Sequence, residues 1–245
     1  MKRALIIGAT SAIAESLAGQ LAKAGASLFL AGRSAEKLEL IARDLKVRHG
    51  VEVEIAAIDF DDFDQHAPLI DRAAERLGGL DLAVICHGSL PDQKACERDW
   101  RLTEAEFRVN CLSAISFLGH LANRFEQQRA GCLIAISSVA GDRGRQSNYV
   151  YGAAKAGLSA FLQGLRNRLY PAGVRVVTVK PGFVDTPMTA HLKKGLLMAS
   201  PETVVRDILR AAESGNCELY TPWFWRWIML VIKVIPERIF VRLKL

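Results

Sequence analysis

Residues 4 to 14 read Ala-Leu-Ile-Ile-Gly-Ala-Thr-Ser-Ala-Ile-Ala, and this stretch decides the fold class of the chain. Its first four residues form an apolar run typical of a buried strand, small residues then suit a tight turn, and a helical pattern covers residues 13–24. A basic start followed by an apolar run also resembles a short signal peptide. We prefer the strand, because cleavage would remove the first strand of the domain.

The same alternation of short strands and helices continues along the chain. Apolar runs rich in Val, Ile and Leu and separated by helices indicate a parallel sheet covered on both faces. This is a doubly wound α/β fold of the Rossmann type, which binds ligands at the carboxyl ends of its strands. The predicted strands are 4–7, 27–31, 51–58, 82–86, 133–137 and 175–179, and the predicted helices are 13–24, 35–48, 67–77, 103–129 and 149–170.

Length and composition suit one globular domain with a short extension. The chain has 245 residues, of which 50% are hydrophobic and 24% charged, and no repeat or Pro/Ser-rich linker divides it. We expect a catalytic and nucleotide-binding domain over residues 1–219 and a C-terminal extension over residues 220–245. The five cysteines are odd in number and lack metal-site spacing. That pattern favours the reducing cytoplasm and predicts neither a disulfide framework nor a metal site.

The net charge of +6 is concentrated near the C-terminus, where residues 226–245 hold five Lys or Arg and one Glu. The body of the chain shows no basic stripe with interleaved aromatic residues and no recognisable nucleic-acid-reading motif. We therefore expect no nucleic-acid partner.

Tyr151 and Lys155 lie four residues apart in a predicted helix, so both side chains project from the same face. An ammonium beside a phenol favours the phenolate and lowers the tyrosine pKa from about 10. A tyrosine tuned in this way can exchange a proton with a carbonyl or an alcohol. The ordinary alternative is an amphipathic side chain beside a solvated lysine. Ser138 stands thirteen residues before the tyrosine, at the end of a predicted buried strand.

These residues resemble the short-chain dehydrogenase/reductase family over about residues 1 to 215. The family's Asn, Ser, Tyr, Lys tetrad corresponds to Asn110, Ser138, Tyr151 and Lys155, with matching spacings between the last three. The resemblance implies that Tyr151 is the general acid, Ser138 steadies the substrate oxygen, Lys155 holds the cofactor ribose, and Asn110 helps hold a water. Ser137 is a rival for Ser138, and Asn110 could instead cap or kink its helix.

The dinucleotide turn departs from the family's Gly-x-x-x-Gly-x-Gly pattern. It reads Gly8-Ala9-Thr10-Ser11-Ala12-Ile13-Ala14, with alanine at the second and third glycine positions. One methyl group is a small intrusion, and a helix N-terminus still offers free N–H groups to a phosphate. Cys86-His87-Gly88 likewise replaces the usual Asn-Ala-Gly, and we interpret His87 as a structural variant.

The end of the second predicted strand indicates which cofactor the chain prefers. Ala31-Gly32-Arg33-Ser34 has no carboxylate for a ribose 2′-hydroxyl, whereas Arg33 can pair with a 2′-phosphate. This favours NADP(H); an Arg33 that only stacks on adenine would be compatible with NAD(H). The cofactor contacts implied by the resemblance are Gly8, Thr10, Ser11, Ala12, Ile13, Arg33, Asp59, Phe60, Gly88, Tyr151, Lys155, Pro181, Gly182, Val184 and Thr186.

The C-terminal extension is rich in aromatic and basic residues. It contains three of the four tryptophans, Trp223, Trp225 and Trp227, within an apolar run too short to span a bilayer. A Trp/Leu/Ile face with flanking basic charge suits a helix lying at an anionic membrane surface, and the alternative is an arm that packs on a neighbouring subunit. Residues 188–198 precede it at the family's substrate-loop position, where Leu192, Leu196 and Leu197 suit an apolar pocket and Lys193 and Lys194 suit a phosphate.

The sequence therefore predicts an NADP(H)-dependent reductase of a ketone, or dehydrogenase of a secondary alcohol, with an amphiphilic substrate. The extension and the small-residue turn resemble, more loosely, reductases of polyprenyl-phosphate-linked sugars such as decaprenylphosphoryl-2-keto-pentose reductase. The alternatives are a reductase of a soluble ketone or 3-oxoacyl thioester, and a non-catalytic dinucleotide-binding regulator. We expect a homodimer or homotetramer paired through helices 103–129 and 149–170, located in the cytoplasm or peripherally at the inner face of the cytoplasmic membrane.

Overall fold

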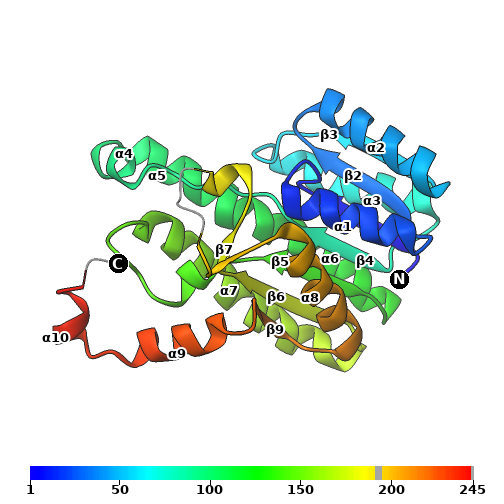
Figure 1. Ribbon diagram of the computed structural model, residues 1–245. Helices are drawn as coiled ribbons and strands as arrows, with labels where there is room; N and C mark the ends of the chain where they lie inside the picture. The colour runs from blue at the N-terminus through cyan, green and yellow to red at the C-terminus, as the bar shows by residue number, and fades with distance from the viewer. Residues whose placement is uncertain (191–194, 244–245) are drawn as a thin grey trace.

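A sheet of seven parallel strands forms the centre of the computed structural model, which describes residues 1–190 and 195–243 (Figure 1). The strand order is β3-β2-β1-β4-β5-β6-β9, so the direction of winding reverses between β1 and β4. The predicted doubly wound Rossmann-type fold is thereby confirmed. The strands are β1 Arg3–Ile7, β2 Ser27–Gly32, β3 Val53–Ala57, β4 Leu82–Ile85, β5 Cys132–Ile136, β6 Arg175–Pro181 and β9 Glu218–Thr221.

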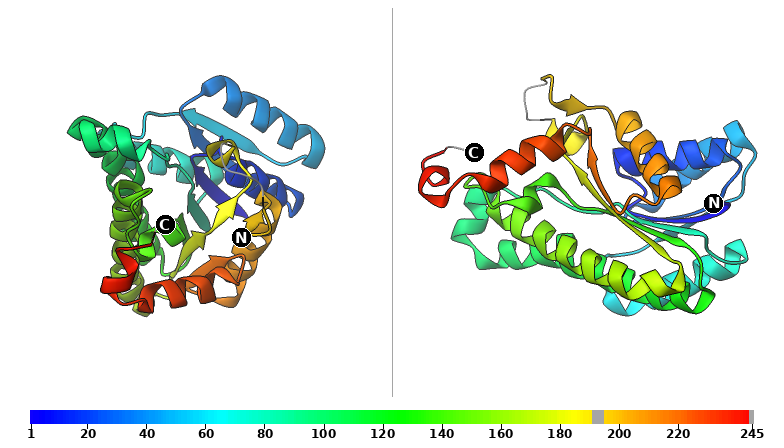
Figure 2. Two further views of the ribbon diagram at one scale, coloured as in Figure 1. Left: turned by 60° about the vertical axis from the view of Figure 1, so that its left-hand side comes forward. Right: turned by 90° about the horizontal axis from the view of Figure 1, so that it is seen from below.

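Helices cover both faces of this sheet, as the edge-on view in Figure 2 (right) shows. Alternate residues of each strand point to opposite faces, so Leu5 and Ile7 join one core whereas Ala4 and Ile6 join the other. The first core lies under α3 His66–Leu77, α6 Ser113–Gln128 and α7 Tyr149–Leu169. The second lies under α1 Ala12–Lys23, α2 Ala35–His49 and α8 Pro201–Ser214.

Several predicted elements differ from the observed ones. The predicted helix 103–129 is α5 Trp100–Phe107, a π-helical turn Arg108–Leu112 and then α6, because the backbone widens around Asn110. The predicted strand 51–58 is shorter at both ends. Neither α4 Gln93–Arg98, α8 nor β9 was predicted, although Ser200 as N-cap and Pro201 at the first helical position are a start signal for α8.

The C-terminal segment packs against the carboxyl edge of the sheet. After β9, which includes Leu219 and Tyr220, the chain forms α9 Trp225–Val234 and α10 Glu237–Phe240. In Figure 1 this segment and the α4–α5 pair both lie beyond the carboxyl ends of the strands. Trp225 and Met229 are buried and form an apolar cluster with Val139. No helix in the described ranges is long and apolar enough to cross a bilayer.

Candidate active site

The turn after β1 is shaped by a close backbone approach at Gly8. Gly8 has φ +83°, and a Cβ there would lie 2.4 Å from the backbone nitrogen of His87, so no larger residue fits. Ser11 then caps α1, its hydroxyl accepting a hydrogen bond from the Ala14 N–H over 3.3 Å. The N–H groups of Ala12 and Ile13 have no partner among the described residues. They form a cradle for an anion at a helix N-terminus.

The alanines that replace the family's glycines do not block this cradle. Ala14 is fully buried in the core between α1 and the sheet, so its methyl group points away from the turn. Ala12 is half-buried at the first turn of α1. Thr10 lies beside the end of β2, because a Cβ on Gly32 would come within 3.5 Å of its methyl group. Arg33 follows Gly32 directly and is exposed. The residues present therefore fit a dinucleotide whose 2′ position faces an arginine.

Three further predicted cofactor residues follow β3 and β4. Asp59 is exposed, and its carboxylate accepts a hydrogen bond from the Asp61 N–H over 3.0 Å. Phe60 is buried and stacks on His87 with ring centroids 4.4 Å apart. A Cβ on Gly88 would lie 2.8 Å from the Asn110 Oδ1 atom. The carboxyl ends of β1 to β4 therefore bring these residues to one edge of the sheet.

His87 has the environment of a neutral packing residue. Burial, together with the positive charge of Lys155, lowers its pKa to about 3. Its Nε2 atom is hydrogen-bonded to the Ser113 hydroxyl over 2.8 Å. An imidazole held neutral in this way fills the space beneath Gly8 and does not act as an acid near neutral pH.

The structure brings Ser138, Tyr151 and Lys155 together. Ser138 follows β5 and starts the 3-10 turn η3 Val139–Asp142, whereas the other two lie on the first turns of α7. Ser138 shares a hydrogen bond with Tyr151. The Ser137 hydroxyl instead contacts the Lys155 carbonyl and the Ser159 hydroxyl, at 3.1 and 2.7 Å. Ser138 is thus the serine available beside the phenol.

The pKa of Tyr151 departs from its ordinary value in the direction opposite to our expectation. Burial raises the pKa of Tyr151 to about 12, and the Ser138 hydroxyl and the Arg145 charge oppose this rise. Burial also lowers the pKa of Lys155 to about 8. The Lys155 ammonium donates to the Ile136 carbonyl over 3.1 Å and lies 5.8 Å from the Tyr151 ring centroid. Sequence spacing predicted the shared helix face but not the burial that raises the pKa of Tyr151.

Asn110 lies in the π-helical turn and is fully buried. Its Nδ2 donates to the Glu106 carboxylate over 2.8 Å and its Oδ1 accepts from the Ser89 N–H over 3.1 Å. The Ser89 hydroxyl also donates to Glu106, over 2.6 Å. Glu106 therefore belongs to the site, because its charge also raises the pKa of Tyr151. Nothing in its local sequence distinguished it from a solvated helical glutamate.

The segment after β6 carries the remaining predicted contacts. A Cβ on Gly182 would lie 1.9 Å from the Trp225 indole nitrogen, so the C-terminal extension lies directly on the Pro181–Gly182 step. Val184 is buried in β7 Phe183–Val184, which pairs with β8 Met198–Ala199. Thr186 caps the short 3-10 turn Pro187–Thr189. Leu196 and Leu197 are exposed. Leu192, Lys193 and Lys194 lie outside the described residues.

A buried ionic cluster, which the sequence analysis missed, ties this segment to the turn after Ser138. Lys180 donates to one Asp142 carboxylate oxygen over 2.7 Å, and the Tyr220 hydroxyl donates to the other over 2.6 Å. Lys180 also pairs with Glu218. Burial opposes the charged lysine, but the hydrogen bonds to Asp142 and Glu218 outweigh it and raise the pKa of Lys180. The sequence signal that could have indicated this cluster is Lys180, a lysine at the end of an apolar strand.

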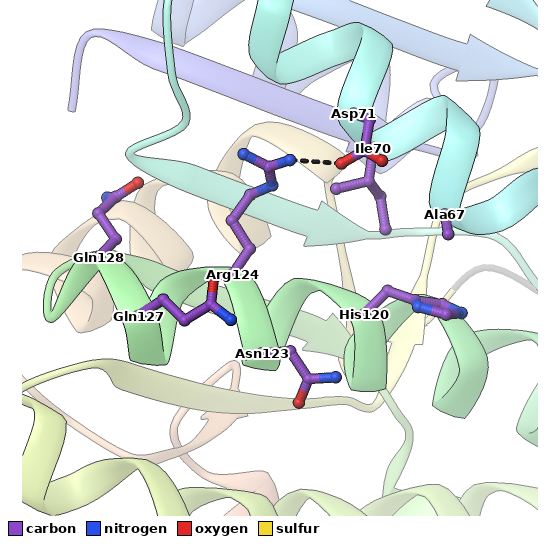
Figure 3. A pocket seen from close by; sticks show the side chains of 8 residues that line it. All are labelled: Ala67, Ile70, Asp71, His120, Asn123, Arg124, Gln127 and Gln128. Atoms are coloured by element: carbon purple, nitrogen blue, oxygen red, sulfur yellow. Dashed lines mark hydrogen bonds and ion pairs between the residues drawn. The ribbon is translucent and has the colours of Figure 1, made fainter.

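A separate polar hollow lies between α3 and α6, where an ion pair joins Arg124 and Asp71 beside His120 (Figure 3). None of the predicted site residues lines it. No group of three His, Cys, Asp or Glu side chains within the described ranges is placed to hold a metal ion.

Comparisons with known proteins agree with this geometry. The model of the short chain dehydrogenase family matches residues 2–196, and the chain belongs to that family. An uncharacterized oxidoreductase of Mycobacterium tuberculosis is 35% identical over 98% of this chain and 96% of its own. Two solved structures share the fold. A Burkholderia cenocepacia short chain dehydrogenase with NADP has a TM-score of 0.83 and 24% sequence identity, and the match covers 99% of this chain and 98% of that one. An actinorhodin polyketide ketoreductase variant with NADPH has a TM-score of 0.81 and 21% sequence identity, and the match covers 91% of this chain and 97% of that one.

We expect the substitution Lys180→Met to lower the free energy of unfolding by about 3–5 kcal/mol, because it leaves the Asp142 carboxylate buried without its cation. Urea unfolding followed by circular dichroism measures this change. The double substitution Lys180→Met with Asp142→Asn should recover part of the loss. Lys94→Met, which removes an exposed lysine paired with Glu97, is the matched control and should change little. Equal effects of Lys180→Met and the control would contradict the role of the buried pair.

Proposed function

We propose that the protein is an NADP(H)-dependent oxidoreductase that interconverts a ketone and a secondary alcohol. The observation that carries this proposal is the meeting of Ser138, Tyr151 and Lys155 at the carboxyl edge of the sheet, beside the anion cradle after β1. Membership of the short chain dehydrogenase family supports it. Bound NADPH supplies the hydride in this chemistry, and the residues of the chain supply the proton and hold the substrate oxygen.

The roles of the residues follow from their positions. A tyrosine whose pKa is raised to about 12 is fully protonated at neutral pH, so Tyr151 can give its hydroxyl proton to a carbonyl oxygen. The Ser138 hydroxyl, next to it, donates a hydrogen bond to the same oxygen as negative charge develops. Lys155 is nearly fully buried and lies beside Gly88, where it can hold ribose hydroxyls. Asn110 and Glu106 fix the π-helical turn, and Asn110 can order a water that resupplies the proton.

The preference for NADP(H) over NAD(H) rests on Arg33. It is exposed at the end of β2, and no carboxylate occupies the adjoining positions 31–34. A guanidinium recognises a phosphate through two parallel hydrogen bonds. The solved structures of similar fold with NADP or NADPH support the same choice.

The C-terminal extension supports an amphiphilic substrate and contact with an anionic membrane surface. Helix α9 buries Trp225 and Met229 but exposes Trp227, Leu230, Val231 and Val234, so it has a second apolar stripe facing outward. A helix that is apolar on all sides is normally covered on all sides. Arg226 and Lys233 are exposed on α9 and complement anionic headgroups. We therefore favour a lipid-linked substrate, such as a polyprenyl-phosphate sugar, and a peripheral position at the inner face of the cytoplasmic membrane.

The remaining proposals concern the domain organisation, the oligomeric state and the alternative substrates. We propose a nucleotide-binding and catalytic unit over residues 1–219, an extension over residues 220–245, and a homodimer or homotetramer paired through the outer faces of α6 and α7. A soluble ketone or 3-oxoacyl thioester is the alternative substrate class if α9 packs on a second subunit. The meeting of Ser138, Tyr151 and Lys155 weighs against a dinucleotide-binding regulator without turnover, which would need the cradle after Gly8 but not these three side chains.

Replacing the catalytic tyrosine tests the reaction. We expect Tyr151→Phe to lower kcat with a ketone by about 10²–10⁴-fold, because the general acid is lost, while NADPH binding by fluorescence titration is unchanged. Tyr170→Phe, at the exposed far end of α7, is the matched control and should keep full activity. Substantial activity in Tyr151→Phe would remove the acid role from this residue.

Replacing Arg33 tests the cofactor choice. We expect Arg33→Ala to weaken NADPH binding about 10–100-fold by calorimetry, because a charge-assisted hydrogen bond contributes about 1.5–3 kcal/mol. NADH binding should change by less than about threefold, since NADH lacks the 2′-phosphate. Arg43→Ala, exposed on α2, controls for the lost charge. Equal losses for both cofactors would instead show that Arg33 stacks on the adenine.

Polar substitutions on the outer stripe of α9 test the membrane contact. Trp227→Ser with Leu230→Ser should weaken binding to phosphatidylglycerol-containing vesicles at least about tenfold in a sedimentation assay, because each side chain loses about 2–3 kcal/mol of apolar burial. Trp100→Ser, an exposed tryptophan on α5, is the control. If the unaltered protein does not bind these vesicles, and the substitutions instead reduce its oligomeric mass, α9 is a subunit arm.

A further inference from the structure

Two polar atoms near the start of α7 are buried and have no hydrogen-bond partner among the described residues. They are the Nε of Arg145 and the Oδ1 of Asn148, both in the turn between η3 and α7. The Gln93 amide nearby is different, because it lies at the Glu97 carboxylate and lowers the pKa of that group. Leaving a buried donor or acceptor unpaired costs about 1–3 kcal/mol, so two such atoms in one turn call for an explanation.

Arg145, Asn148 and Gln93 all lie near the start of α7, the first two in the turn before it and Gln93 through a hydrogen bond to it. The Gln93 Oε1 atom accepts a hydrogen bond from the Val150 N–H over 3.0 Å, which places its amide one residue before Tyr151. Asn148 is the N-cap residue, and its carbonyl accepts from the Gly152 N–H over 2.8 Å. Because Gln93 bonds this first turn, the Asn148 side chain makes no capping bond of its own. The unpaired atoms of Arg145 and Asn148 therefore lie on the turn that leads into the helix of Tyr151, the residue that we assign as the acid.

Arg145 differs from its neighbour Arg143 in how its guanidinium is used. Arg143 donates to three main-chain carbonyls at the end of α9 and pairs with Glu237. In contrast, the Arg145 side chain has neither a hydrogen bond nor an ion pair with any described residue. Its charge nevertheless acts on the Tyr151 phenol, and burial lowers its pKa. A partly buried guanidinium without a counter-charge is a site that an anion would satisfy.

We propose that Arg145, with Asn148 in the same turn, forms a subsite for an anionic group of the substrate, a phosphate or a carboxylate, next to the carbonyl at Ser138 and Tyr151. This assignment rests on the proposed ketone reductase function and specifies its substrate class. Arg145 would donate to the anion, while the Asn148 oxygen would accept from a neighbouring hydroxyl or amide N–H. The subsite is independent of the cradle after Gly8, which lies at the start of α1.

Matched pairs of ketones test the subsite and separate the two anions. The pairs are hydroxyacetone phosphate with hydroxyacetone, and acetoacetate with methyl acetoacetate, each assayed with NADPH. In the unaltered protein we expect kcat/KM to be at least about 30-fold higher for the anionic member of one pair, and that pair identifies the anion. Arg145→Met should abolish this preference, because kcat/KM falls at least about 30-fold further for the anionic ketone than for its neutral partner. The neutral ketone also loses some activity, since the Arg145 charge acts on Tyr151. Arg145→Lys should keep part of the preference.

Arg48→Met is the matched control, because Arg48 is an exposed arginine near the end of α2, paired only with Asp44 on its own helix. It should keep the full preference. A preference for neutral ketones, or an equal loss on both members of a pair in Arg145→Met, would overturn the subsite.

A calorimetric experiment distinguishes a wrong subsite assignment from a wrong assignment of the reaction. If the protein reduces none of the four ketones, titration of inorganic phosphate and of acetate into the NADPH-saturated protein decides the matter. Binding that is lost in Arg145→Met and kept in Arg48→Met would uphold the subsite and reject these ketones as substrates. The absence of any anion binding to the unaltered protein would reject the subsite itself.

Discussion

The buried ion pair between Lys180 and Asp142 is the interaction on which the arrangement of the site depends. The two side chains are 5% and 4% exposed, and both carboxylate oxygens of Asp142 are used, one by Lys180 and one by Tyr220. The free energy needed to remove both charged groups from water is nearly as large as the free energy gained from their attraction. The main effect of the pair is therefore to exclude arrangements of the chain in which one of the two charges is buried alone. Here it fixes the turn that begins at Ser138 relative to the end of β6. The serine and the Pro181–Gly182 step therefore cannot move independently.

Arg143, the residue after Asp142, extends this constraint to the C-terminal segment. Arg143 donates to the carbonyls of Ile232, Lys233 and Ile235, which are left unpaired at the end of α9, and its guanidinium lies 3.8 Å from the Phe240 ring centroid. A cation at a helix C-terminus is also favoured by the helix dipole. With Trp225 pressed on Gly182, the extension is anchored at both ends of α9. Its inner stripe is part of the core of the site, so only its outer stripe is free to meet another surface.

Sequence reasoning reached the parts of this site that depend on local spacing. Helical periodicity placed Tyr151 and Lys155 on one face, and strand ends placed Gly8, Gly88 and Ser138 at one edge. The pKa of Tyr151 was expected to fall, but it depends on burial by elements distant in sequence, including Glu106 on α5. The role of Lys180 depends on the pairing of β6 with β9, a four-residue strand whose pattern has no clear alternation. The spacing of residues in the sequence could reveal neither the raised pKa of Tyr151 nor the role of Lys180.

The charges around Tyr151 explain how a phenol with a raised pKa can still release its proton. Two cations, Lys155 and Arg145, lie near it, whereas Glu106 opposes them from the end of α5. Proton transfer to a carbonyl leaves a phenolate, and that anion is stabilised by both cations in a site of low dielectric constant. Ammonium and guanidinium groups therefore matter more after the proton has left than before. An anion paired with Arg145 would neutralise one of these cations, so the substrate itself would influence the acidity of Tyr151.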